Sequence, residues 1–181
     1  LGGHKDLGIH TEMFSDGIID LCEKGVVTNK YKTVHPNKVV TGFALGSRKL
    51  YNYIHDNPSF VFLDIDYVNE PSVIRRNKKV VAINSAIGVD LHGNIWADSM
   101  RARQIYSGVG GQADFIRGAQ YSEGGVAIIA MKSTTRDGTS KIVDRCPAGI
   151  TTTAIPADDV ILVTEHGALD PRGLSLGERA V

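Results

Sequence analysis

Short runs of apolar residues alternate along the chain with longer polar stretches that suit helices. Five runs are rich in valine, isoleucine and phenylalanine and have the length of strands; they lie at residues 38–43, 60–63, 80–84, 126–131 and 160–164. The run at 126–131 is the most continuous, which predicts a strand covered on both faces. Strands that alternate with helices are typical of an α/β fold with a mostly parallel sheet.

Two of the polar stretches predict short helices. Residues 15–25 would be capped by Ser15 or Asp16 and would end at a glycine. Residues 47–57 place apolar side chains on one face and stop at an Asn-Pro pair. Residues 88–98 alternate around a His-Gly-Asn turn, which predicts an antiparallel hairpin. Together these elements predict an open, mostly parallel sheet flanked by helices, with an antiparallel part.

Composition places the chain among globular proteins. It has 181 residues, 42% hydrophobic and 22% charged, so we expect a single domain over residues 1–181. Twenty basic residues balance twenty acidic ones, and no apolar run approaches the ~20 residues that span a bilayer, so we expect no nucleic-acid or membrane partner. Cys22 and Cys146 are too few for a disulfide framework and form no zinc motif, which favours a reducing, cytoplasmic location.

A glycine-rich segment lies at residues 108–112, where Gly108, Gly110 and Gly111 occupy three of four successive positions. Glycines let backbone N–H groups approach a ligand closely, which suits a phosphate, a carboxylate or a developing oxyanion. A plain tight turn explains the same spacing equally well. The segment also matches the degenerate dinucleotide fingerprint through Gly108, Gly110 and Ala113. However, no buried apolar strand precedes it and no acidic residue follows at the expected distance.

Glu12 closes a short apolar segment just before the first predicted helix. Open α/β sheets place ligand-binding groups in such positions, at the carboxyl end of a strand. A carboxylate there can attack an acyl carbonyl, provided that an oxyanion site stabilises the tetrahedral state. Taken alone, a solvated or helix-capping glutamate is the commoner case.

Several different short motifs follow one another along nearly the whole chain. They are Leu7-Gly8-Ile9-His10-Thr11-Glu12-Met13, Ser15-Asp16-Gly17, Gly46-Ser47, Asp66-Tyr67-Val68-Asn69, Ile83-Asn84, Val89-Asp90, Ala97-Asp98-Ser99, Tyr106-Ser107-Gly108-Val109-Gly110-Gly111-Gln112, Val163-Thr164-Glu165 and Arg172-Gly173. This ordered set resembles the acetyl-CoA hydrolase/transferase family, a family I CoA-transferase group, and is most similar to its 4-hydroxybutyrate CoA-transferases. The first motif resembles the active-site segment of that family.

The resemblance implies a role for each candidate residue. In that family two similar α/β halves enclose the active site, and the carboxyl half supplies a nucleophilic glutamate. The chain would therefore be the carboxyl-terminal catalytic half of a larger CoA-transferase, with the amino-terminal half absent and Glu12 as the covalent nucleophile. Asn69 would lie near the reacting acyl group, and Lys132 would either meet a coenzyme A phosphate or be a solvated lysine. The oxyanion and coenzyme A contacts would fall on Gly108, Val109, Gly110, Gly111 and Gln112.

The implied reaction moves coenzyme A between an acyl-CoA and a short-chain carboxylate, in a ping-pong cycle through a glutamyl-CoA thioester. It requires no metal and no permanently bound cofactor, since coenzyme A and acyl-CoA are the substrates. An acetyl-CoA hydrolase that uses the same glutamate and a non-catalytic CoA-binding domain are the alternatives. The family forms homo-oligomers and needs its amino-terminal domain, so we expect the chain alone to be inactive. Glu165 and Arg172 are expected to be structural, in a buried or interdomain ion pair.

Overall fold

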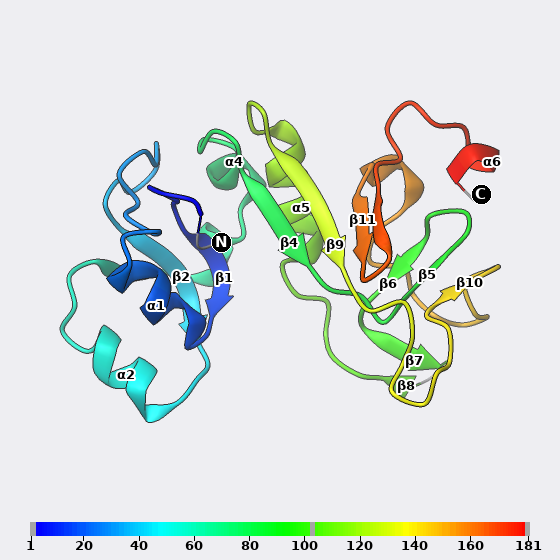
Figure 1. Cartoon of the computed structure of the whole chain (residues 1–181), viewed down its shortest axis with the longest axis horizontal. Coiled ribbons are helices and arrows are strands. Elements are labelled where there is room, and N and C mark those ends of the chain that lie inside the picture. The colour runs from blue at the N-terminus through cyan, green and yellow to red at the C-terminus, as the bar shows by residue number, and fades with distance from the viewer. Residues whose placement is uncertain (1–2, 102–103, 180–181) are drawn as a thin grey trace. The chain divides into compact units, whose positions relative to one another are not determined.

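The structure is a computed structural model that describes residues 3–101 and 104–179. It divides into two compact units, Leu1–Lys78 and Lys79–Val181, where the sequence led us to expect a single domain (Figure 1). Both units combine parallel strands with helices. The predicted α/β class is confirmed, and its mainly parallel pairing with an antiparallel part is also observed.

The first unit contains a parallel sheet with the strand order β1–β2–β3. The strands are His10–Phe14, Val39–Ala44 and Phe60–Phe62, and helices α1, Gly17–Glu23, and α2, Arg48–Ile54, connect them. A helix in each connection is what parallel neighbours require. Strands β2 and β3 and both helices lie where the sequence predicted them. Strand β1 continues two residues beyond Glu12, so Glu12 lies within the strand rather than at its end.

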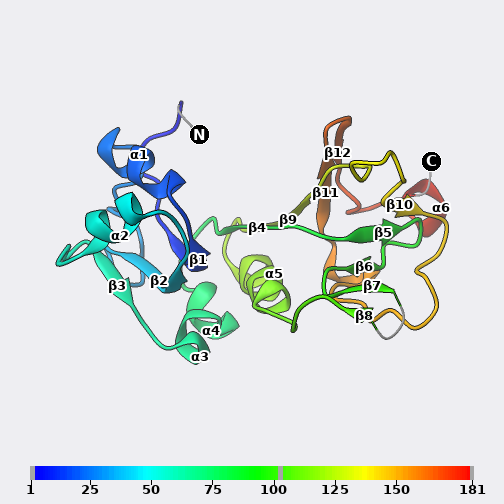
Figure 2. The ribbon, with the colours of Figure 1, turned by 90° about the horizontal axis from the view of Figure 1, so that it is seen from below.

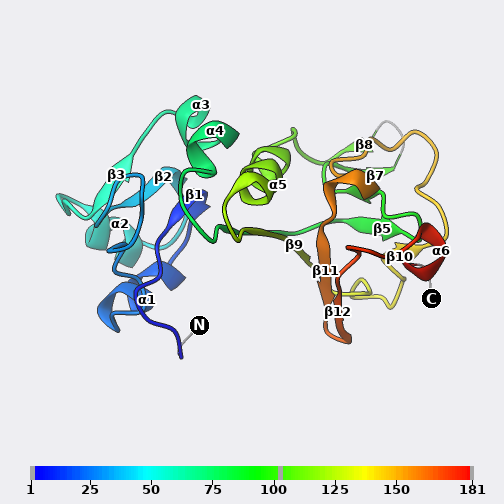
Figure 3. The ribbon, with the colours of Figure 1, turned by 90° about the horizontal axis from the view of Figure 1, so that it is seen from above.

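Helices cover both faces of this sheet. Figures 2 and 3 show α1 on one side and α3, Ile65–Val68, with α4, Pro71–Ile74, on the other. Helix α3 packs on β1 and β2, and Gly42 allows this approach. A Cβ at Gly42 would collide with Ile65 Cδ1 and lie 3.2 Å from the Glu12 carbonyl oxygen. The core on the α1 side consists of Phe14, Ile18, Ile19, Val27, Val39, Leu50 and Phe60.

The second unit is built on a four-stranded sheet with the order β12–β11–β9–β4. These strands are Gly167–Leu169, Ile161–Thr164, Val126–Ala130 and Val81–Asn84, and only β12 among them runs antiparallel. A second sheet joins β10, Ile142–Val143, β5, Gly88–Asp90, and β6, Ile95–Trp96; a third pairs β7, Ser99–Arg101, with β8, Gln104–Ile105. Strands β5 and β6 are antiparallel, which confirms the predicted hairpin.

Helix α5, Gln112–Tyr121, covers one face of β4 and β9 (Figures 2 and 3). Ala127 and Ile129 of β9 are buried, whereas Val126, Ile128 and Ala130 are half-buried. The predicted strand is therefore covered completely on one face and only partly on the other. The remaining helical segments are the 3₁₀ turn Pro156–Asp158 and α6, Leu176–Arg179. None of the helices in residues 3–101 and 104–179 is long and apolar enough to cross a membrane.

Candidate active site

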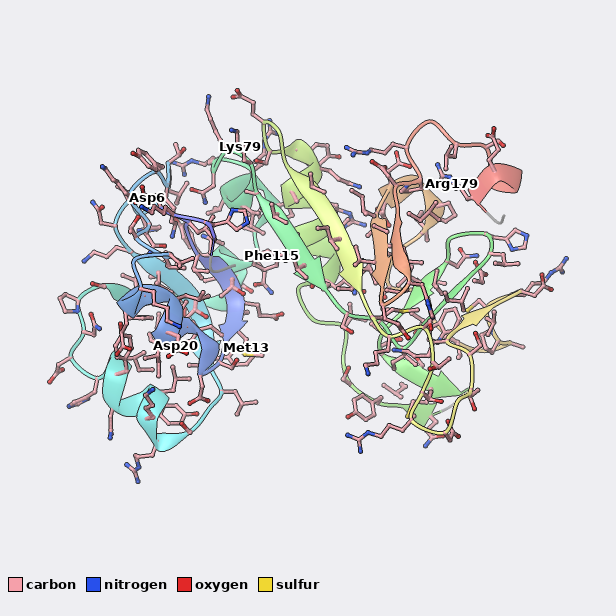
Figure 4. The ribbon with its side chains drawn as sticks, viewed as in Figure 1. Asp6, Met13, Asp20, Lys79, Phe115 and Arg179 are labelled. Atoms are coloured by element: carbon pink, nitrogen blue, oxygen red, sulfur yellow. The ribbon has the colours of Figure 1, made fainter. Side chains whose placement is uncertain are left out.

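Glu12 lies in β1, an edge strand whose only sheet partner is β2 in the described part of the first unit. Its carbonyl oxygen accepts the Thr41 hydroxyl at 3.1 Å, which ties the backbone at Glu12 to the neighbouring strand. The Glu12 side chain is half-buried. Met13, the next residue on β1, is labelled in Figure 4, and 40% of its surface is exposed. The half-buried carboxylate is therefore held on a strand and stays partly accessible, as a group that must meet a ligand requires.

Asn69 lies directly against this carboxylate. It is the C-cap residue of α3, and its backbone N–H donates to the Ile65 carbonyl at 2.9 Å. From this position its side-chain Nδ2 donates to Glu12 Oε1 at 3.1 Å. Within the described residues, Asn69 Oδ1 is buried and has no hydrogen-bond partner. The structure thus brings together two of the residues that the sequence singled out.

The Glu12–Asn69 contact has a direct chemical consequence. An amide donor against one carboxylate oxygen restricts rotation of the carboxylate. If a nucleophile adds to the Glu12 carbonyl carbon of an activated glutamyl group, negative charge develops on that oxygen, where the donor already lies. The arrangement can therefore orient a nucleophilic carboxylate and stabilise an oxyanion formed on it.

The glycine segment belongs to the second unit and leads into α5. Gly108, Val109 and Gly110 are exposed, Gly111 is the N-cap with φ −73°, and Gln112 opens the helix. Gly108 has no positive φ, and a Cβ there would meet nothing within 4 Å. Neither a turn conformation nor a close contact within the described chain requires glycine at 108. This finding weakens the plain-turn explanation at that position.

Two anchors hold the ends of the glycine segment. At the start, the Asp98 carbonyl accepts the N–H groups of Tyr106 and Ser107 at 2.6 and 3.2 Å. The Asp98 carboxylate in turn accepts the hydroxyls of Thr151 and Ser99, which lower its pKa, that of Thr151 most strongly. At the other end, Gln112 Nε2 donates to the Ser85 carbonyl at 2.9 Å. Sequence reasoning recognised Asp98 only as part of a motif, because its role depends on backbone contacts.

Gln112 also carries a buried polar atom. Its Oε1 has no hydrogen-bond partner among the residues that the structure describes. Buried acceptors are almost always paired, so an unpaired one at the end of the glycine segment is a candidate contact for a ligand.

Strand β8, which precedes the glycine segment, is short, exposed and antiparallel to β7. A dinucleotide-binding site would need a buried parallel strand at this position. The structure therefore argues against the dinucleotide-binding interpretation of the glycine segment.

Lys132 is exposed and lies two residues beyond the end of β9, in the second unit. The next residue, Ser133, donates its N–H and its hydroxyl to the Glu165 carboxylate at 2.8 and 2.9 Å. Arg172 instead pairs with Asp170 at 2.5 Å, and both of these side chains are largely exposed. The expectation of a buried ion pair between Glu165 and Arg172 is therefore wrong for the described residues, whereas an interdomain pair stays a prediction.

A cavity of about 440 Å³ in the second unit contains none of the predicted site residues. Its walls are mainly apolar, with Asp90, His166 and Arg179 among the polar members. Asp90 already accepts hydrogen bonds from His92, Asn94 and Cys146. Arg179 (Figure 4) already donates to the Pro156 carbonyl and to Asp159. Two of the charged groups are thus occupied within the chain, and we assign the cavity no reaction.

The family of the chain follows from comparison with known proteins. The sequence profile of the acetyl-CoA hydrolase/transferase C-terminal domain matches residues 46–181. The chain belongs to this family. 4-Hydroxybutyrate coenzyme A transferase of Clostridium kluyveri is 45% identical over 181 residues, which cover 99% of this chain and 42% of that protein. The resemblance inferred from the motifs is confirmed, and Glu12, which precedes the profile match, lies within the match to this relative.

Two solved structures are also similar to this chain. RipA from Yersinia pestis has a TM-score of 0.92 and 42% identity, covering 99% of this chain and 40% of that one. A 4-hydroxybutyrate CoA-transferase from Porphyromonas gingivalis has a TM-score of 0.82 and 40% identity, and the match covers 98% of this chain and 41% of that one. Acetyl-CoA hydrolase of Kluyveromyces lactis is 30% identical over 97% of this chain and 32% of that protein. The chain spans about two-fifths of the length of the CoA-transferases that it matches.

Proposed function

We propose that the chain is the carboxyl-terminal catalytic part of an enzyme that transfers coenzyme A between an acyl-CoA and a short-chain carboxylate. The observation that carries the proposal is the hydrogen bond from Asn69 Nδ2 to Glu12 Oε1. It supplies a half-buried carboxylate with an oriented amide donor, in a family whose named members include CoA-transferases and acetyl-CoA hydrolases. The 4-hydroxybutyrate enzymes among the relatives make 4-hydroxybutyrate one candidate acyl group.

Glu12 is the covalent nucleophile of the proposed ping-pong cycle. Its carboxylate attacks the thioester carbonyl of the donor, the C–S bond breaks, and an acyl-glutamyl anhydride and coenzyme A thiolate result. The thiolate then attacks the glutamyl carbonyl, releases the donor carboxylate and leaves a glutamyl-CoA thioester. An acceptor carboxylate reverses both steps and departs as the new acyl-CoA.

We assign a charge-stabilising role to Asn69 in the first unit and another to the glycine segment in the second unit. Asn69 Nδ2 lies against the Glu12 oxygen on which charge develops when the thiolate attacks the glutamyl carbonyl. We assign the oxyanion of the donor acyl group and the nearby coenzyme A contacts to Gly108, Val109, Gly110, Gly111 and Gln112. The open space around Gly108 supports a close approach by a ligand. We also assign the exposed Lys132 side chain to contact with a coenzyme A phosphate.

Intact-mass spectrometry tests the mechanism on the full-length enzyme that carries this chain. Incubation with acetyl-CoA should add a covalent coenzyme A group to the wild type and leave Glu12→Ala unmodified. Glu23→Ala, which removes an exposed carboxylate on α1, is the matched control and should be modified like the wild type. Absence of the adduct in every protein, with acetyl-CoA binding established separately, would favour the non-catalytic CoA-binding domain.

An acetyl-CoA hydrolase is the second candidate, because acetyl-CoA hydrolases are among the relatives. In that reaction water rather than a carboxylate resolves the glutamyl thioester. An assay with acetyl-CoA and butyrate separates the two. Formation of butyryl-CoA supports the transferase, whereas steady loss of thioester without a new acyl-CoA supports the hydrolase.

The complete enzyme also needs the polypeptide that lies outside this chain in its relatives. The chain covers 42% of the C. kluyveri transferase, and we propose that an amino-terminal domain supplies the other coenzyme A contacts and that the whole enzyme forms a homo-oligomer. The 181 residues alone should therefore show little or no turnover. Robust transferase activity from this chain by itself would contradict the proposal.

A further inference from the structure

His10 and Glu12 lie two residues apart on β1, so their side chains point to the same face of the strand. That face carries α3. His10 Nε2 lies 2.8 Å from the Val68 carbonyl oxygen, and Glu12 Oε1 accepts the Asn69 amide at 3.1 Å. One strand therefore contacts two consecutive residues at the end of α3 through two alternate side chains.

The protonation of His10 follows from its partner. A carbonyl oxygen only accepts, so Nε2 must carry the proton and donate to Val68. Burial lowers the pKa of the His10 imidazole, which favours the neutral ring with a single N–H. The contact is thus a specific donor interaction rather than general filling of space.

Helix α3 depends on such contacts because it is only four residues long. A helix of one turn has few internal hydrogen bonds and is not stable by itself. Besides the two contacts from β1, His35 Nε2 lies 2.9 Å from the Tyr67 hydroxyl. Tyr67, Val68 and Asn69 are therefore each hydrogen-bonded to a side chain outside α3, and the contact of His10 is the one on the residue next to Asn69.

We propose that His10 is a positioning residue for the Glu12 site: its Nε2–H bond to the Val68 carbonyl holds the end of α3 so that the Asn69 amide is aimed at Glu12. This inference rests on the proposed function of Glu12. His10 touches neither substrate nor the reacting atoms in this role. It acts through Asn69, and that dependence can be measured.

Two amide replacements at His10 provide a matched pair. In His10→Gln the side-chain Nε2 lies near the place of the imidazole Nε2 and can still donate to Val68. In His10→Asn the amide is shorter by one carbon and cannot reach that carbonyl. In the full-length enzyme we expect His10→Asn to lower kcat about tenfold, with KM for acyl-CoA changed less than about twofold. His10→Gln should keep kcat within about threefold of the wild type.

A double-mutant cycle with Asn69→Ala tests whether His10 acts through Asn69. Once the amide is gone, its alignment no longer matters, so His10→Asn should cost less than about twofold in the Asn69→Ala background. Equal losses in both backgrounds, or an unchanged kcat in His10→Asn, would overturn the proposal. His55→Asn, at an exposed histidine on the surface, is the control and should leave kcat unchanged.

The failure of this inference can be told apart from failure of the proposed function. If Glu12→Ala retains both turnover and the covalent adduct, the mechanism itself is wrong. If Glu12→Ala abolishes both but the His10 and Asn69 losses are additive, only the positioning role is wrong. Thermal melting of each variant, compared between His10→Asn and His10→Gln, shows whether a lost kcat follows from lost stability instead.

Discussion

The side-chain Nδ2 of Asn69 lies 3.1 Å from Oε1 of Glu12, although 57 positions separate the two residues in the chain. The pair joins the central part of β1 to the end of α3. It is the one place where the structure brings predicted site residues of the first unit into direct contact.

Asn69→Ala should lower kcat of the full-length enzyme by about 10²–10³, which is typical of losing one oxyanion donor. KM for acyl-CoA should change little, because the long coenzyme A arm contacts other groups. Steady-state kinetics measure both parameters. Asn52→Ala, at an exposed asparagine on α2, is the matched control. A loss below about threefold in Asn69→Ala would mean that this amide does not stabilise the reaction.

Gly88 and Trp96 face each other across β5 and β6 and are both buried. A Cβ at Gly88 would collide with the Trp96 ring and lie 2.7 Å from its Cε2. Gly88→Ala should therefore lower the free energy of unfolding by about 1–3 kcal/mol, because a rigid indole cannot move aside. Urea denaturation measures the change, with Gly17→Ala, where nothing lies within 4 Å of the new Cβ, as control.

A second background tests whether the Trp96 ring causes the loss of stability in Gly88→Ala. In a Trp96→Leu background the smaller side chain removes the collision, so Gly88→Ala should cost less than about 0.5 kcal/mol there. The same cost in both backgrounds would show that the indole is not responsible.

Glu165 should stabilise the fold in a pH-dependent way. Its own backbone N–H and the two donors of Ser133 lower its pKa from 4.5 to about 2. Because the folded pKa is below the unfolded value, the stabilisation is present above about pH 4.5 and is lost as the pH falls toward 2. Glu165→Gln should thus be less stable than the wild type near pH 6, and the gap should narrow below about pH 4.5 and close only near pH 2. Denaturation curves that stay equally far apart at all pH values would refute this.

Lys32 should make the stability of the fold depend on pH in the alkaline range. Its Nζ donates to the Ile9 and Lys38 carbonyls at 2.7 and 2.6 Å, and burial lowers its pKa from 10.5 to about 8. Between these values the unfolded chain binds more protons, so stability rises with pH. From about pH 7 to 10, the wild type should gain about 1 kcal/mol relative to Lys32→Met, a figure discounted for partial exposure. Lys5→Met, at an exposed lysine, should run parallel to the wild type.

Much of the fold could be predicted because its signals are local. The apolar runs at 38–43, 60–63, 80–84 and 160–164 became β2, β3, β4 and β11, with ends shifted by a residue or two. Each run shows its period of two or its continuous apolar character within a few residues. The four-residue helices α3 and α4 were not predicted, since one helical turn leaves almost no periodic signal and forms only against a sheet.

The candidate site was less accessible to local reasoning. The motifs identified Glu12, Asn69 and the glycine segment as candidates, but Glu12 was expected at the end of a strand and lies inside one. His10 was not among the predicted site residues, although its spacing of two from Glu12 on a strand is a signal that places both side chains on one face. Glu165 and Arg172 were expected to form a buried or interdomain ion pair, but within the described residues Glu165 accepts from Ser133 and Arg172 pairs with Asp170, because pairing of surface charges depends on where loops bring them.

The sequence by itself determined the α/β class, the positions of the main strands and of helices α1 and α2, the family and the residue types available for chemistry. Only the tertiary structure decided that the Asn69 amide meets Glu12 and that His10 holds the neighbouring carbonyl of Val68. The physical reason is distance along the chain. Periodicity and turn signals act over a few residues, whereas these hydrogen bonds form only when α3 packs against the sheet near Gly42 and brings residues 68 and 69 to β1.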